Sequence, residues 1–225
     1  MRFPVSLGLT LGTMASAHFL LHRVVPQADL AVGAGLVGGL AVVAKASDLS
    51  ADDLGLARRR WRSGVRWGAA AAGIVAVGYG VAALFPAVRE LAADPTNSWS
   101  ATWLQALLVI PLATVIPEEF AFRGVLFGLL QRQSGRRVAT AVSSALFGLW
   151  HVLPALGGGA ANASAVGVVG DSTMGTVLRV VGTVIFTGLG GVVLCELRSR
   201  SGSLLAPIGL HWALNGMGEL FVRAV

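Results

Sequence analysis

Seven long apolar runs divide the sequence, and they constrain the fold more than any other feature. They cover about residues 3–21, 30–44, 67–85, 99–130, 138–153, 176–197 and 204–222. A helix needs about 20 apolar residues to cross a bilayer, whereas a membrane β-barrel would need strands of alternating hydrophobicity, which this sequence lacks. Only 12% of the residues are charged, against about 25% in soluble domains. The sequence therefore predicts an all-α, polytopic membrane bundle of about seven spanning helices in a single domain, residues 1–225.

The distribution of basic residues predicts how this bundle is oriented. Most of them lie in the loops at 45–66, 131–138 and 198–202, whereas the loops at 86–98 and 154–175 contain one arginine, Arg89. Lysine and arginine are enriched in cytoplasmic loops. We therefore expect the N-terminus to be cytoplasmic and the C-terminus external. We assign the protein to a bacterial plasma membrane. This placement also explains the net charge of +6 without a nucleic acid partner.

Three stretches interrupt the apolar pattern and carry further predictions. Residues 47–66 begin with aspartates and continue with arginines and Trp61, which favours a solvated loop with a short helix at the membrane surface. The run at 99–130 is longer than one span and contains Pro111 and Pro117, which should kink it or start a new segment. The stretch at 154–175 is rich in glycine, alanine and serine, and we expect a flexible linker there.

Three charged residues lie close together inside the apolar run at 99–130. A charge at the centre of a membrane helix costs about 2.5–3.5 kcal/mol, so such residues are candidates for function. Glu119 and Arg123 are four residues apart, which places them on one helix face and allows them to neutralise each other. Glu118 points about 100° away from Glu119. The spacing therefore leaves Glu118 as the carboxylate that is free for chemistry, although a purely structural polar cluster remains the alternative.

Two histidines and an asparagine in later runs fall at a similar depth. Glu118 lies 14 residues before Arg132, and His151 lies 14 residues after Arg137, so both should be roughly 21 Å from the same loop. His211 should be roughly 16 Å from that side, and Asn215 lies one helical turn further along the same face. We expect Trp150 and Trp212, the neighbours of the two histidines, to pack or face lipid.

These residue types are suited to activating water in a poorly solvated site. A carboxylate serves as a general base, an imidazole holds the water or moves its proton, and an amide N–H stabilises an oxyanion. A second hypothesis is a metal site, because Glu118, His151 and His211 form a familiar ligand set for one divalent ion such as zinc. The spacing lacks the compact H-E-x-x-H motif, so it does not decide between the two mechanisms.

At these positions the chain resembles the CAAX prenyl protease and bacteriocin-processing family of intramembrane proteases, also called CPBP or Abi. Three motifs carry the resemblance: Glu118-Glu119-x-x-x-Arg123, Phe147-x-x-x-His151 and His211-x-x-x-Asn215. It covers about residues 99–222, the predicted catalytic helices, whereas residues 1–95 correspond to helices that vary in such families.

The resemblance implies an endopeptidase that cleaves a membrane-associated peptide or protein at a site reached from the cytoplasmic side. Glu118 and His151 would then activate water, His211 and Asn215 would stabilise the oxyanion, and Glu119, Arg123 and Phe147 would support them. Family members are described both as metalloproteases and as metal-free glutamate proteases. Two alternatives to the protease are an ion- or proton-coupled transporter and a non-catalytic membrane immunity or binding protein of the same family.

Overall fold

The computed structural model describes residues 1–93, 98–157, 170 and 172–225, and these residues form helices and no strands. The α-helices are α1 (Phe3–Phe19), α2 (Asp29–Ala46), α3 (Trp61–Ala82), α4 (Pro86–Ala92), α5 (Trp99–Leu104), α6 (Ile116–Glu119), α7 (Phe127–Trp150), α8 (Val152–Leu156), α10 (Thr173–Ser201), α11 (Leu205–Trp212) and α12 (Gly218–Ala224). Between them lie π-helical segments η1 (Leu20–Val24), η3 (Gln105–Val115), η4 (Phe120–Leu126) and η5 (Ala213–Met217), and the 3-10 turn η2 (Arg58–Arg60). The predicted linker at 154–175 lies mostly outside the described residues.

Five helical stretches in the described residues are long and apolar enough to cross a membrane. They are Phe3–Val24, Asp29–Ala46, Arg58–Ala82, Trp99–Leu156 and Thr173–Ser201. The fourth includes two of the predicted runs, 99–130 and 138–153, which are separated by a kink at Gly135, whose φ of 81° and ψ of 169° are not helical. The seventh predicted run is helical from 205 to 224 but is not among the five. The predicted all-α polytopic membrane bundle is confirmed.

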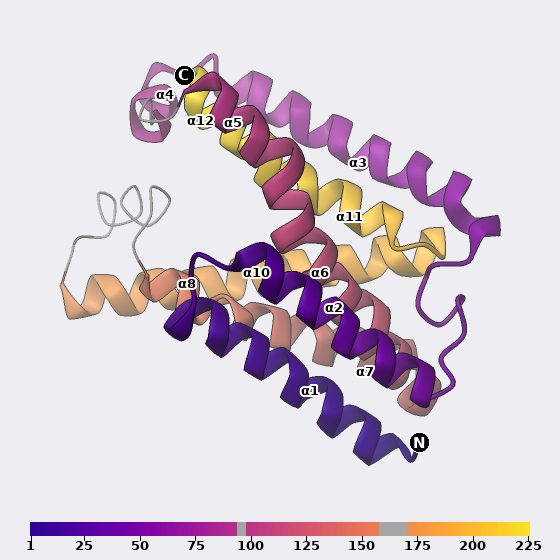
Figure 1. Ribbon diagram of the computed structural model, residues 1–225. Helices are drawn as coiled ribbons and strands as arrows, with labels where there is room; N and C mark the ends of the chain where they lie inside the picture. The colour runs from indigo at the N-terminus through magenta and orange to yellow at the C-terminus, as the bar shows by residue number, and fades with distance from the viewer. Residues whose placement is uncertain (94–97, 158–169, 171) are drawn as a thin grey trace.

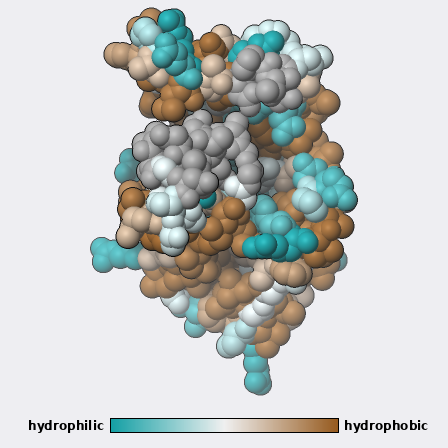
Figure 2. All heavy atoms as spheres, turned by 90° about the vertical axis from the view of Figure 1, so that its left-hand side faces the viewer, coloured by the Kyte–Doolittle hydropathy of each residue, from teal (hydrophilic) through white to brown (hydrophobic). Residues whose placement is uncertain are grey.

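The outer surface of the bundle is apolar, as lipid contact requires. Ile74, Leu84 and Phe186 are more than 70% exposed, and Figure 2 shows apolar side chains, in brown, over large parts of one face. In water such a surface would favour aggregation or association. The described structure therefore fits an integral membrane protein.

The helices pack in two groups that diverge from one end of the molecule. Helix α1 packs on α2 and α7 packs on α10, while α3 packs on α11. In Figure 1 the group of α3, α5, α11 and α12 separates from α7, α8 and α10 toward the left-hand side, where the C-terminus and α4 lie. The N-terminus lies at the opposite, right-hand end, near the loop that joins α2 to α3.

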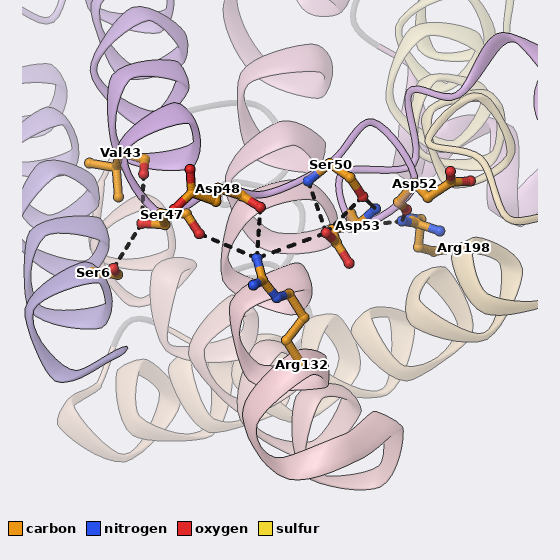
Figure 3. A network of polar contacts seen from close by, with 9 residues as sticks. All are labelled: Ser6, Val43, Ser47, Asp48, Ser50, Asp52, Asp53, Arg132 and Arg198. Carbon is orange, nitrogen blue, oxygen red and sulfur yellow. Dashed lines mark hydrogen bonds and ion pairs between the residues drawn. The ribbon is translucent and has the colours of Figure 1, made fainter. Parts of the chain in front are cut away.

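That loop is held at the right-hand end by two arginines (Figure 3). Arg132 donates to the carbonyl oxygens of Ser47 and Asp48, and Arg198 donates to those of Asp52 and Asp53. Of the loop with a short surface helix predicted at 47–66, residues 47–57 form the loop, and the helical part consists of η2 and the first turns of α3, which begins at Trp61. Arginine donors occupy the loop carbonyls, and positive φ angles at Asp48 (54°) and Gly55 (72°) prevent a continuous helix.

Candidate active site

The two glutamates lie on α6, a single helical turn between the π-helical segments η3 and η4. Pro111 lies inside η3 and Pro117 in the first turn of α6. Proline has no N–H to donate in the α-helical pattern, and the wider π-helical turns let neighbouring backbone groups form other hydrogen bonds around it. The helix therefore continues through both predicted interruptions without a new segment. π-helical turns occur frequently at functional sites, because they re-aim the side chains on either side of them.

Glu119 is the centre of a buried ionic network. Its Oε1 lies 3.1 Å from Arg123 Nη1 and 2.8 Å from His211 Nδ1, and neither the glutamate nor the arginine is exposed. The Phe147 ring covers the guanidinium, whose Cζ lies 4.0 Å from the ring centroid. Since Glu119 accepts from the imidazole, His211 carries its proton on Nδ1. The pairing of Glu119 with Arg123, predicted from their spacing, is confirmed.

Glu118 points to a different set of groups. Its Oε1 accepts a hydrogen bond of 2.9 Å from Trp150 Nε1, and its Oε2 lies 3.9 Å from His211 Nε2. That Oε2 is buried and has no hydrogen-bond partner among the described residues. The side chain as a whole is 12% exposed. Each glutamate has an Oε2 without a hydrogen-bond partner in the described part of the chain. Glu119 is fully buried and pairs with Arg123 and His211 through Oε1, whereas Glu118 is partly exposed and its Oε2 lies beside an imidazole.

His151 has a fixed orientation at the end of α7. Its Nδ1 lies 2.8 Å from the carbonyl oxygen of Phe147, one turn earlier. A carbonyl only accepts, so Nδ1 carries the proton and Nε2 has a lone pair. The Phe147 ring contacts both histidines edge-on, with ring centroids 4.7 Å from His151 and 5.7 Å from His211. Each imidazole therefore presents Nε2 as its free ring nitrogen.

A cavity of about 550 Å³ brings most of the predicted site residues together between α3, α7, α10 and α11. His151, His211, Asn215 and Phe147 line it, and the remaining wall is mainly apolar. Glu118 is not part of this lining, although its Oε2 approaches His211. Sites of this kind, apolar with a few converging polar groups, are typical of small binding pockets. The sequence-predicted residues therefore lie around one location.

The metal hypothesis was tested against the same geometry. Among the described residues, no group of three His, Cys, Asp or Glu side chains is arranged to hold a metal ion. Glu118, His151 and His211 consequently do not form a three-ligand set as they are placed. The orientation of both histidines by an acceptor at Nδ1 is nevertheless a feature of metal ligands as well as of general bases.

Trp150 makes a contact with the candidate site that sequence reasoning missed. It was expected to pack or face lipid because neighbours on a helix diverge, but its indole N–H reaches Glu118. The signal that could have found it is that a buried tryptophan N–H needs a partner. The ring also packs on His18 from α1, with centroids 4.1 Å apart. The N-terminal helix therefore borders the site.

Comparison with known families gives one match. A family model described as type II CAAX prenyl endopeptidase Rce1-like matches residues 98–217, which include every predicted site residue. No curated protein and no solved structure matches the chain. The matched segment begins just before α5 and ends with η5, so Trp150 lies within it and His18 outside it.

Proposed function

Because the chain belongs to the Rce1-like family of type II CAAX prenyl endopeptidases, we propose that it hydrolyses a peptide bond of a membrane-associated protein by metal-free water activation at Glu118. The family makes it an integral membrane protein of the peptidase class whose partners are the lipid bilayer and a protein substrate. The proposal extends this to the residues that carry out the reaction. Its principal support is the difference between the two adjacent glutamates.

Among the described residues Oε2 is unpaired in both glutamates, but Glu119 is unsuited to be the base because it is fully buried and its carboxylate is bound by Arg123 and His211. Glu118 has an unpaired Oε2, and Trp150 holds the other oxygen in place. A general base needs a free oxygen within reach of the water that it deprotonates. We therefore assign Glu118 as the base and Glu119 as the residue that positions His211.

In the proposed reaction, a water oxygen attacks the carbonyl carbon of the substrate while Glu118 Oε2 takes one of its protons. His151 Nε2, which has a lone pair, accepts a hydrogen bond from the same water and orients it. The tetrahedral intermediate then collapses as the C–N bond breaks, and the proton on Glu118 passes to the departing amine. The products are a carboxylic acid and an amine, and transfer of the acid proton to the amine gives a carboxylate and an ammonium group, so Glu118 is regenerated as the base.

The oxyanion role of His211 and Asn215 places a condition on the protonation of His211. Its Nδ1–H is used by Glu119, so Nε2 can donate to an oxyanion only when the ring carries both protons. With ionised glutamates, Glu118, Glu119, Arg123 and doubly protonated His211 then have no net charge. Asn215 lines the same cavity and supplies an amide N–H. Such donors contribute most in a site from which water is excluded.

Kinetics of purified variants, run beside metal analysis, test this mechanism. Asn215→Ala should lower kcat by about 10²–10³-fold, the usual cost of one oxyanion donor, with little change in substrate binding. His151→Ala should remove nearly all activity. Chelation should leave the parent active, whereas a metal mechanism predicts stoichiometric zinc that is lost in both His151→Ala and His211→Ala. Full activity of Asn215→Ala would refute its role in the oxyanion site.

The orientation in the membrane is part of the same proposal. The loops around residues 47–60, 132 and 198 contact one another at one end of the bundle, as Figure 3 shows, and they contain most of the basic residues. We place this end in the cytoplasm of a bacterial cell, with the C-terminus outside, and expect the substrate to enter from the cytoplasmic side. Reporters fused after Arg62 or Arg136 should be cytoplasmic, and one fused after Ala93 external. The opposite pattern would reverse the orientation and the side of entry.

A further inference from the structure

Asn215 lies in η5, a π-helical segment between α11 and α12. The hydroxyl of Tyr79, on α3, donates a hydrogen bond of 2.8 Å to the carbonyl oxygen of Leu214, the residue before Asn215. This bond reaches η5 from another helix, α3. The conformation of η5 is therefore held from outside the helix that contains it.

A second side chain ties η5 to the helix of the glutamates. The indole N–H of Trp212 donates a hydrogen bond of 2.9 Å to the carbonyl oxygen of Ala106, in η3. Trp212 immediately precedes η5, and η3 precedes the turn that carries Glu118. The two bonds together fix η5 against α3 on one side and against η3 on the other.

Two glycines next to Asn215 make both bonds sterically feasible. A Cβ at Gly218 would lie 2.8 Å from the Tyr79 hydroxyl oxygen, and one at Gly216 would lie 2.6 Å from Trp212 Nε1. Both separations are shorter than side chains tolerate, and neither glycine has a positive φ. The glycines are therefore explained by space for the two donors. The sequence Asn215-Gly216-Met217-Gly218 therefore places a glycine at each position where a Cβ would meet one of the two donors.

Tyr79 also has a fixed place beside the reaction centre. Its ring stacks on Phe221, with centroids 5.1 Å apart and planes at 29°, and it lines the cavity of His151, His211 and Asn215. Tyr79 lies in the N-terminal part of the chain, outside the matched residues 98–217. The family match therefore does not account for it.

We propose that Tyr79 is a positioning residue, which orients Asn215 for the oxyanion through its hydrogen bond to Leu214. This inference rests on the proposed function, because it assumes that Asn215 stabilises the transition state. Tyr79 does not donate to the substrate itself, since its hydroxyl hydrogen is directed to the Leu214 carbonyl. Its effect on the reaction must consequently pass through Asn215.

The activity test is Tyr79→Phe, which removes the hydroxyl and keeps the ring that stacks on Phe221. Loss of one neutral hydrogen bond should lower kcat about 3–10-fold, and KM should stay within about twofold because the oxyanion forms only in the transition state. In the Asn215→Ala background the same substitution should have no further effect. Gly80→Ala is the matched control, because a Cβ there meets nothing within 4 Å, and it should retain the parental rate.

A spectroscopic test needs no activity. Tyr79 is the only tyrosine of the sequence, so tyrosine labelled with ¹³C at Cζ gives one NMR signal that reports its hydroxyl hydrogen bond. Gly218→Ala should shift this signal and lower kcat by a factor similar to that for Tyr79→Phe, whereas Gly80→Ala should change neither.

An unshifted signal in Gly218→Ala, an undiminished kcat in Tyr79→Phe, or an equal loss in the Asn215→Ala background would each overturn the inference. Failure of the proposed function looks different. In that case the parent would hydrolyse no peptide or Glu118→Gln would stay active, while the NMR signal would still decide whether Tyr79 holds the turn.

Discussion

Arg123 and Arg198 are both buried, but the protein stabilises their positive charges in different ways. Arg123, in the interior, pairs with the carboxylate of Glu119 at 3.1 Å. Arg198, at the end of α10, donates instead to the backbone carbonyls of Asp52 and Asp53 at 2.8 and 3.0 Å. Removing the partner of Arg123 would leave a charge where water cannot reach. At the loop, water can replace a lost partner, so the same kind of change should cost less.

The largest effect on stability is expected for Glu119→Gln. Removing one partner of a buried ion pair costs about 3–5 kcal/mol of unfolding free energy, because the other charge is left uncompensated. The new amide oxygen can still accept from His211, so the substitution isolates the pairing with Arg123. Thermal unfolding of the purified variant measures the loss. The double variant Glu119→Gln/Arg123→Met should recover part of it, and a single variant as stable as the parent would show that the interior pair is not structural.

An intermediate effect is expected for Arg198→Met. It removes two charge-assisted hydrogen bonds, but the carbonyls that it frees are near solvent, so we expect a loss of about 2 kcal/mol. Limited proteolysis should also cut the loop at 47–57 faster. Arg200→Met is the matched control, because Arg200 is exposed and, within the described part of the chain, its one ion pair is with Glu196; it should cost about 0–1 kcal/mol. Equal losses for the two variants would show that the hydrogen bonds of Arg198 to the loop carbonyls contribute no more than a surface ion pair.

The smallest effect is expected for Asp52→Asn. The Asp52 side chain pairs with Arg59 at 2.7 Å, and both side chains are largely exposed. Such pairs contribute about 0.2–1 kcal/mol and are screened by salt. The carbonyl of residue 52 still binds Arg198 in this variant. The unfolding free energies of the variant and the parent should therefore differ at low salt and converge at high salt. A salt-independent loss above about 2 kcal/mol would mean that the Asp52 side chain holds the loop.

Sequence reasoning succeeded where the determinant is local. The pair Glu119 and Arg123 follows from a separation of four residues, and the apolar runs follow from the length of a membrane span. His151, His211 and Asn215 were placed at one depth by counting residues from the basic loops, and they do line one cavity. These features depend on helix geometry alone.

Features that depend on how helices rotate against each other could not be predicted in the same way. The bond from Trp150 to Glu118 and that from His211 to Glu119 join residues 32 and 92 positions apart. Composition predicted a loop with a short helix at 47–66 but not where the helix begins, because distant arginines bind the carbonyls of residues 47–53. Long-range packing decided these contacts, and a single sequence contains no local sign of it.

The assignment of Glu118 as base and Glu119 as structural partner is tested most directly by Glu118→Gln, assayed for peptide hydrolysis and thermal unfolding beside the parent. The new amide oxygen can still accept from Trp150, so the unfolding temperature should stay close to that of the parent. Activity should fall by at least about 10²–10⁴-fold, the usual contribution of a general base. Retained activity in a folded Glu118→Gln protein would contradict the account.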